Sequence, residues 1–349
     1  MRALVLCEGH FGDPSGKTAH GLVRYSDLYE IVAVIDSTLA GRDAGEFLDG
    51  KKTGIPIVAS LKEGLSMRPT HLVMGVATDG GRLPESYRPI LVEALEHKLH
   101  IVSGLHEKLE RDEELVRLAR AYGASIQDVR VVPPKEEQHF FSGKIEEVTC
   151  PVVAVLGTDS ALGKRTTARV LVKALNSAGY KAVFIGTGQT GRLQGARYSI
   201  ILDSLVNDFL TGEIEHVVWS AWHDERPDII VVEGQGGLTH PGAPGGYEII
   251  AGARVKGVIL QHAPGRQNLD GFIMYPMPDL GPAVTIAEAM SGHALVAITL
   301  NHEHLSREEV ESWKKRYHDR FGKPVTDVLF DGPQPLVDAV VARFGLRKR

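Results

Sequence analysis

Short apolar runs rich in β-branched residues alternate along the chain with longer segments in which apolar residues recur at helical spacing. The clearest helical segment runs from Glu85 to Lys98, where Ile90, Leu91, Ala94 and Leu95 form one apolar face. The apolar runs in the first part of the chain predict strands at Ala3–Cys7, Ile31–Ile35, Ile55–Val58, His71–Val76 and Ile101–Ser103. This alternation is typical of βαβ units around a parallel sheet.

The pattern lapses between Val131 and Pro151, where the adjacent Pro133 and Pro134 precede a charged stretch. A second series then predicts strands at Val152–Leu156, Lys181–Ile185, Ile229–Val232, Gly257–Gln261 and Leu295–Thr299, and helices at Lys164–Ala178, Arg307–Phe321 and Pro335–Phe344. Runs without polar alternation, such as DIIVV, indicate strands buried on both faces of a parallel sheet. We therefore predict an α/β fold with two domains, residues 1–135 and 151–349, and a linker at 136–150.

Composition narrows the class of protein. The 349 residues are 43% apolar and 24% charged, which excludes a disordered, collagen-like or coiled-coil chain. The net charge of −5 provides no general field for nucleic acid or an anionic membrane, and two cysteines, Cys7 and Cys150, cannot build a disulfide framework. Glu8 ends the first apolar stretch before it reaches the length of a signal sequence. We expect a cytoplasmic protein that acts on small molecules, with no membrane or nucleic-acid partner.

The strongest motif joins an apolar strand, a glycine-containing loop and a helix in the stretch VVAVLGTDSALGKRTTARVLVKAL, residues 152–175. A P-loop needs glycines where backbone N–H groups converge on phosphate oxygens, and a lysine that reaches further phosphates. Gly157, Gly163 and Lys164 fill these positions, although Thr158 stands where the first glycine usually lies. We call residues 157–164 the phosphate loop.

The residue after Lys164 departs from the usual motif. Arg165 stands where a Ser or Thr hydroxyl normally binds Mg²⁺, and Thr166 and Thr167 are displaced around the helix. The motif therefore predicts a phosphate-bearing ligand, while it places NTP hydrolysis in doubt. The candidate ligand-binding residues are Gly157, Thr158, Asp159, Gly163, Lys164, Arg165, Thr166 and Thr167.

Glu233 ends another apolar strand and opens a glycine-rich loop, EGQGGLTHPG. A carboxylate at this edge resembles a Walker-B residue and could bind Mg²⁺ or act as a general base; the alternative is a carboxylate that caps backbone amides in a glycine turn. His240 in the same loop is either functional or an exposed loop histidine.

Two further loops follow predicted strands. The first, with Gln189, Thr190, Arg192 and Arg197, supplies donors suited to a carboxylate or phosphate. We place Asp203 and Asp208 on the helix that follows it. The second loop carries His262 and Arg266, which would lie at the same edge of the sheet.

The motifs GTDSALGK and VVEGQGG resemble those of the dethiobiotin-synthetase branch of P-loop proteins. A wider set, which includes KTAHGLVRYS, VAVIDSTLAGRDAGE, GGRLPESYR, TGQTGRLQGARY, EGQGGLTHPG and HAPGR, resembles the DgcN-type D-glutamate N-acetyltransferase family over residues 1 to about 280. That resemblance implies a Rossmann-like N-terminal domain, a P-loop NTPase-like C-terminal domain, and transfer of acetyl from acetyl-CoA to an acidic D-amino acid.

The resemblance also suggests roles for the candidate residues. The phosphate loop would hold the phosphates of CoA, with no metal ligand among the site residues. Glu233 or His240 would be the base, and Gln189 with loop amides would stabilise the oxyanion. The acceptor would be bound by Arg192 and Arg197, together with His262 and Arg266 at the same edge of the sheet. Two alternatives stay open, an ATP- and Mg²⁺-dependent ligase or kinase and a nucleotide-sensing regulator, as does assembly into a homo-oligomer.

The N-terminal domain carries weaker signals. Gly9 and Gly12 follow the first strand without a G-x-G-x-x-G motif, and GDPSGKT has one residue too few between its glycines for a P-loop. Asp36, at the end of the second strand, is better interpreted as a helix cap than as a ribose ligand. Lys17, Thr18, His20 and Arg24 lie in one of the family-like segments listed above.

Overall fold

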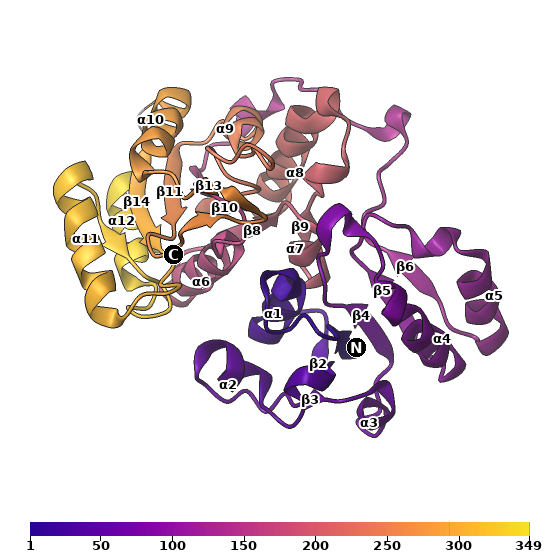
Figure 1. Ribbon diagram of the computed structural model, residues 1–349. Helices are drawn as coiled ribbons and strands as arrows, with labels where there is room; N and C mark the ends of the chain where they lie inside the picture. The colour runs from indigo at the N-terminus through magenta and orange to yellow at the C-terminus, as the bar shows by residue number, and fades with distance from the viewer. Residues whose placement is uncertain (293, 349) are drawn as a thin grey trace. The chain divides into compact units, whose positions relative to one another are not determined.

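The computed structural model describes residues 1–292 and 294–348 and divides into two compact units (Figure 1). The first unit comprises Met1–Val132 and the segment Gln189–Ala196. The second comprises Pro133–Gly188 and the chain from Arg197 onward. Both units are α/β, as the alternation of apolar runs predicts.

The first unit is built on a parallel sheet with the strand order β3-β2-β1-β4-β5-β6. Its strands are β1 (Arg2–Leu6), β2 (Glu30–Ile35), β3 (Ile57–Val58), β4 (His71–Met74), β5 (His100–Ser103) and β6 (Ile126–Asp128). Its helices are α1 (Lys17–Arg24), α2 (Ala44–Asp49), α3 (Leu61–Leu65), α4 (Arg88–Glu96) and α5 (Glu113–Tyr122). The direction of strand order reverses between β1 and β4, as it does at the nucleotide crevice of Rossmann folds.

A short helix from elsewhere in the sequence, α7 (Gln189–Leu193), packs within this first unit. Thr190 Oγ1 lies 3.0 Å from Thr18 Oγ1, and Gln194 Nε2 donates to the carbonyl of Gly21 at 2.6 Å. A Cβ at Gly104, just after β5, would lie 2.9 Å from the Gln189 side chain. The segment therefore reaches from α1 to the end of β5, and the predicted loop contains a short helix.

At the carboxyl edge of the first sheet, Asp36 and the N–H of Ala19 both have hydrogen-bond partners within the protein. Asp36 caps a 3₁₀ turn by accepting from the N–H of Thr38 at 3.0 Å, and it also accepts from the N–H of Phe11 at 2.9 Å. The N–H of Ala19, in the first turn of α1, donates to Gly75 at 2.8 Å. The interpretation of Asp36 as a cap is confirmed.

The second unit is built on a parallel sheet with the order β15-β14-β11-β7-β10-β8-β9. Its strands are β7 (Val152–Gly157), β8 (Ala182–Gly186), β9 (Tyr198–Ser199), β10 (Ile229–Glu233), β11 (Gly257–His262), β14 (Leu295–Leu300) and β15 (Val325–Thr326). Its helices are α6 (Lys164–Ser177), α8 (Leu210–Glu225), α9 (Tyr247–Gly252), α10 (Leu280–Ser291), α11 (Arg307–Phe321) and α12 (Gln334–Phe344). A small hairpin, β12 (Asn268–Leu269) with β13 (Phe272–Pro276), follows β11.

Alternate residues of β7 face two different cores, which explains its uninterrupted apolar sequence. Val153 and Val155 pack with α6 and α12, whereas Ala154 and Leu156 pack with α8, α9, α10 and α11. The sheet thus lies between two helical layers (Figure 1). β7 is the central strand, so its end presents the phosphate loop near the middle of the sheet's carboxyl edge.

One sequence expectation, the placement of Asp203 and Asp208 on the following helix, is wrong. Asp203 and Asp208 do not lie on the long helix, because two 3₁₀ turns, Leu202–Ser204 and Asn207–Phe209, precede the start of α8 at Leu210.

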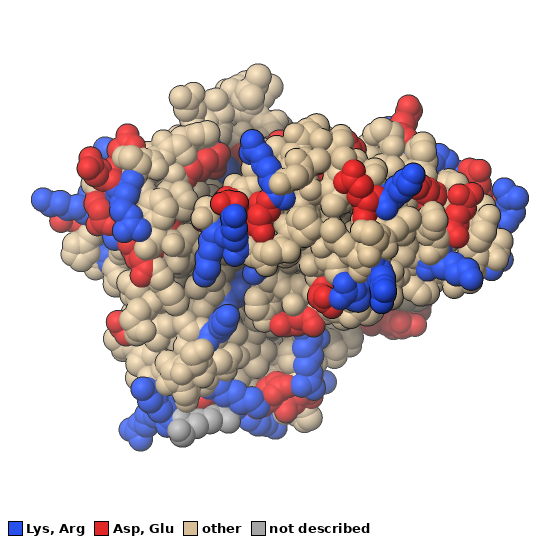
Figure 2. Space-filling model, turned by 90° about the horizontal axis from the view of Figure 1, so that it is seen from below, with Lys and Arg blue, Asp and Glu red and all other residues tan. Residues whose placement is uncertain are grey.

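The surface shows no simple charge division. On the face seen in Figure 2, basic and acidic side chains are interspersed, in keeping with the nearly balanced composition. Within the described residues, no helix combines the length and the apolar content needed to cross a bilayer.

Candidate functional site

The phosphate loop joins β7 to α6 at the carboxyl edge of the second sheet. Gly163 has a φ of +94°, which a side chain would strain, and the helix begins at the next residue. The first N–H groups of α6 have no acceptor within the helix, and they carry its positive end. The expected turn from strand to helix therefore forms with the geometry that anion binding requires.

The carbonyl groups of four successive residues, 159–162, all accept from side-chain donors of the protein. Lys164 donates to the first at 2.6 Å, and Arg266 donates to the second and third at 3.0 and 3.5 Å. Asn301 donates to the fourth at 3.2 Å. Because the N–H of a trans peptide points away from its C=O, these contacts direct the amide N–H groups of residues 161–163 away from the side-chain donors, whereas the N–H of Ser160 donates to the Asp159 carboxylate. The loop is held as a cradle of N–H donors.

Lys164 spans two loops. Its ammonium donates to the carbonyls of Asp159 and Gly236, at 2.6 and 2.7 Å, and only 6% of the residue is exposed. The absence of a side chain at Gly157 makes room for its stem, since a Cβ there would lie 3.1 Å from Lys164 Cδ. The lysine therefore couples the phosphate loop to the loop after β10.

Glu233 lies at the end of β10, in register with Val155 of the neighbouring β7. It is 5% exposed, and its Oε1 lies 3.6 Å from Arg165 Nη1 while its Oε2 accepts weakly from the N–H of Thr187 at 3.3 Å. Burial raises the pKa of Glu233, whereas the charges of Arg165, Arg169 and Lys164 lower it, and burial dominates. A buried carboxyl with a raised pKa beside an anion site is a candidate general base.

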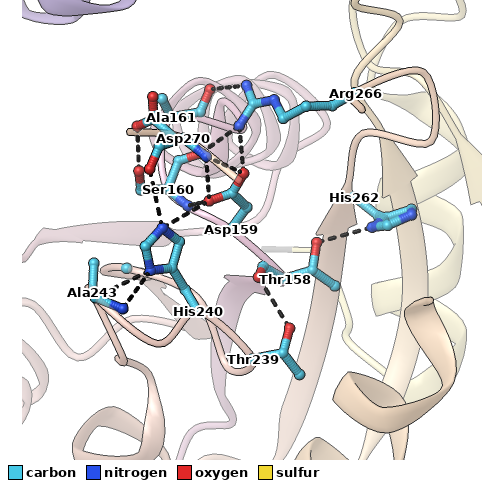
Figure 3. A network of polar contacts seen from close by, with 12 residues as sticks. Thr158, Asp159, Ser160, Ala161, Thr239, His240, Ala243, His262, Arg266 and Asp270 are labelled. Atoms are coloured by element: carbon cyan, nitrogen blue, oxygen red, sulfur yellow. Dashed lines mark hydrogen bonds and ion pairs between the residues drawn. The ribbon is translucent and has the colours of Figure 1, made fainter. Parts of the chain in front are cut away.

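Asp159 is the centre of a buried polar network (Figure 3). Its carboxylate accepts from Arg266 at 2.7 Å, from the N–H of Ser160 at 2.6 Å and from the N–H of Asp270 at 3.1 Å. His240 Nε2 lies 3.4 Å from the same carboxylate. Asp159 thus joins the phosphate loop to the segments that carry Arg266, Asp270 and His240, and its side chain positions the loop.

Thr158 and Thr167 also direct their side chains into protein contacts. Thr158 Oγ1 lies 2.9 Å from His262 Nδ1, and Thr167 Oγ1 donates to Gln261 Oε1 at 2.6 Å. Burial lowers the pKa of His262 to about 4, so its imidazole is neutral near pH 7. These groups stabilise the base of the loop, while Gly163, Lys164, Arg165 and Thr166 lie around its mouth at the start of α6.

His240 is buried, so its interpretation as an exposed loop histidine is wrong. Its Nδ1 accepts from the N–H groups of Gly242 and Ala243, at 3.1 and 2.8 Å, which leaves the proton on Nε2. Nε2 faces the carbonyl of Asp270 at 3.2 Å. Because both ring nitrogens are used to shape the loop after β10, His240 is better suited to positioning than to proton abstraction.

Three predicted site residues do not join this cluster within the second unit. Arg197 is 69% exposed and pairs with Glu225, and its guanidinium lies 5.2 Å from the Tyr198 ring centroid. Gln189 and Arg192 lie on α7 in the first unit, where Arg192 is exposed.

Three residues near the phosphate loop were not predicted from the sequence. Asn301 and Glu303 follow β14, and Glu303 binds Arg266 at 2.6 Å. Their position after a predicted strand was a usable signal, because parallel strands end at one edge of the sheet. Asp270, which also accepts from the Ser160 hydroxyl, lies in the turn of the β12–β13 hairpin and has no comparable local signal.

Comparison with known proteins identifies the family. Residues 37–132 match a Rossmann-like domain of unknown function, DUF1611_N, and residues 139–337 match the P-loop domain of the same family, DUF1611_C. The chain is 33% identical to a D-glutamate N-acetyltransferase of Tritonibacter scottomollicae over 290 residues, which cover 81% of this chain and 84% of that protein. It is 30% identical to a D-glutamate N-acetyltransferase of a Pseudoalteromonas species, with coverages of 81% and 83%.

A solved structure agrees over the whole length. The crystal structure of a DUF1611 family protein from Anabaena variabilis has a TM-score of 0.89 and 32% identity, and the match covers 98% of this chain and 99% of that one. The resemblance noted from the sequence motifs is therefore confirmed. The chain belongs to the DUF1611 family and, with its curated relatives, to the N-acetyltransferase class of enzymes.

Proposed function

We propose that this enzyme transfers the acetyl group of acetyl-CoA to the amino group of D-glutamate, with the phosphate loop holding the phosphates of CoA. The observation that carries the proposal is the N–H cradle at the start of α6, formed without a metal-binding hydroxyl at position 165. CoA presents a pyrophosphate and a ribose phosphate, which such a cradle can bind without cleaving them. The named activity of the two relatives supports D-glutamate as the acceptor.

In this reaction the acceptor nitrogen attacks the thioester carbonyl, a C–N bond forms, and the C–S bond breaks as CoA leaves as a thiol. Glu233 is the base that the geometry favours, since its carboxyl has a raised pKa and lies beside the loop. It would take one proton from the ammonium group of D-glutamate, which frees the nitrogen lone pair for attack, and release that proton to solvent. The second proton, lost from nitrogen as the amide forms, balances the one gained by the thiolate. His240 would hold the neighbouring loop in shape.

The product assay tests the proposal directly. Purified protein with acetyl-CoA and D-glutamate should release free thiol and form N-acetyl-D-glutamate in equal amounts, identified by mass spectrometry and chiral chromatography. L-glutamate serves as the matched control for chirality. Thiol release without N-acetylated product, or conversion of D-glutamate that requires ATP and Mg²⁺ and no acetyl-CoA, would contradict it.

The two carboxylates of D-glutamate need cationic partners. Arg192 and Arg197 are the two arginines to compare for this role. Arg197 is paired with Glu225, whereas Arg192 lies exposed on α7, so we expect the KM for D-glutamate to be more sensitive to Arg192. Arg192→Ala should raise the KM for D-glutamate at least about tenfold, or ~1.4 kcal/mol, with little change for acetyl-CoA. Arg197→Ala should change either KM less than about twofold. Steady-state kinetics in which each substrate is varied in turn measure both KM values. The expectation fails if Arg197→Ala raises the KM for D-glutamate and Arg192→Ala does not.

A further inference from the structure

P-loop nucleotide hydrolases hold Mg²⁺ between the hydroxyl that follows the lysine and a carboxylate at the end of a nearby strand. In this chain Arg165 stands at the hydroxyl position and Glu233 at the carboxylate position. Arg165 Nη1 lies 3.6 Å from Glu233 Oε1. The guanidinium of Arg165 therefore extends from the hydroxyl position toward Glu233, into the place where a metal ion would be held.

The hydroxyl of Thr167 does not replace the missing metal ligand. Thr167 donates its hydroxyl to Gln261 Oε1 at 2.6 Å, and both residues are buried. Within residues 1–292 and 294–348, no group of three His, Cys, Asp or Glu side chains is arranged to hold a metal ion. The usual pair of P-loop metal ligands is therefore not formed beside Glu233, because Arg165 stands at the hydroxyl position and the Thr167 hydroxyl is used by Gln261.

The charge around Glu233 points the same way. Three cationic side chains, Arg165, Arg169 and Lys164, act on this one carboxylate. An added divalent cation would be repelled by three cationic side chains, whereas a phosphate group would be attracted by all of them. Arg165 Nη1 and Glu233 Oε1 are 3.6 Å apart, so the contact is an ion pair that orients the guanidinium.

We infer that Arg165 takes the place of Mg²⁺ in this P-loop and makes phosphate binding independent of divalent metal. A guanidinium is permanently charged and can donate two parallel hydrogen bonds to a phosphate, which suits it to this task. Glu233 keeps the guanidinium at the mouth of the loop. The inference rests on the proposed function because it takes CoA as the natural ligand. It identifies Arg165 as the residue that selects metal-free CoA over Mg²⁺-bound ATP.

Calorimetric titration of the whole protein tests this inference, with CoA and inorganic pyrophosphate as separate probes. The wild type should bind CoA with the same Kd, within about twofold, in EDTA and in excess Mg²⁺. Arg165→Ser in EDTA should lose at least about tenfold in affinity, and Mg²⁺ should restore much of that loss because serine and Glu233 then offer the usual metal ligands. Arg165→Ala should lose as much, with no recovery in Mg²⁺.

Lys173→Ser is the matched control, because Lys173 is an exposed cation on the same helix and should leave every affinity unchanged. Wild-type binding of CoA that requires Mg²⁺ would overturn the inference and leave the proposed function intact. If CoA does not bind but pyrophosphate binds equally in EDTA and Mg²⁺, the proposed function fails and the role of Arg165 stands. Binding of neither probe in EDTA would overturn the role of Arg165.

Discussion

Replacing Lys164 with alanine should weaken acetyl-CoA binding by at least about 100-fold, or ~2.7 kcal/mol. The side chain is nearly buried and its ammonium donates to the carbonyls of Asp159 and Gly236, so the substitution removes the cation that we propose binds phosphate and also the link between two loops. Two carbonyl groups also lose a donor, which costs stability. We expect the protein to remain folded with a lower Tm, as measured by circular dichroism, while calorimetry with acetyl-CoA shows the loss of affinity.

Two further variants separate the charge from the structural link. Lys164→Met keeps most of the apolar stem and should lose affinity almost as severely, because a thioether cannot replace the ammonium. Lys173→Ala removes an exposed cation from the same helix and should behave as the wild type. If both Lys164 variants bound acetyl-CoA normally, the phosphate loop would not be the CoA site.

Glu233→Gln should lower kcat by about 10²–10⁴-fold, the usual contribution of a general base. Glutamine has nearly the same shape but cannot accept the proton of the attacking amine. The variant removes a negative charge from an anion site, so the Kd for acetyl-CoA should change less than about threefold. Steady-state kinetics together with calorimetry distinguish the two quantities.

The pH dependence gives a second readout for Glu233. Only the ionised carboxylate can act as base, and burial raises its pKa, so the wild-type rate should rise with pH as Glu233 loses its proton. This part of the rise should be absent in Glu233→Gln. A variant with a normal kcat, or one in which only acetyl-CoA affinity falls, would make Glu233 a positioning residue for Arg165.

The sequence predicts the central elements well where local pattern and tertiary structure agree. The helix Arg307–Phe321 has the predicted bounds, and α6 ends one residue earlier than predicted. Both have a clear start signal, a capping serine in one and Gly163 in the other. The short strands β9, β12 and β15 were not predicted, because two or so residues carry too little pattern and depend on neighbouring strands.

Some parts of the candidate site can be predicted from local sequence, and other parts depend on contacts between distant residues. The phosphate loop and Glu233 follow from glycines and strand ends that lie close in the sequence. The packing of α7 in the first unit depends on contacts such as Thr18–Thr190, which join residues far apart in the chain. The burial of His240 and the contacts of Asp159 likewise depend on the hairpin after β11. Local sequence cannot indicate which of two polar residues faces a ligand and which faces a loop.

The most direct test of the central claim is a crystal structure of the protein with CoA in a buffer that contains EDTA. The account predicts a phosphate group of CoA in the loop between Gly157 and Lys164, in contact with backbone N–H groups of that loop and with the side chains of Lys164 and Arg165. CoA bound elsewhere on the protein, with no phosphate group in this loop, would contradict the account.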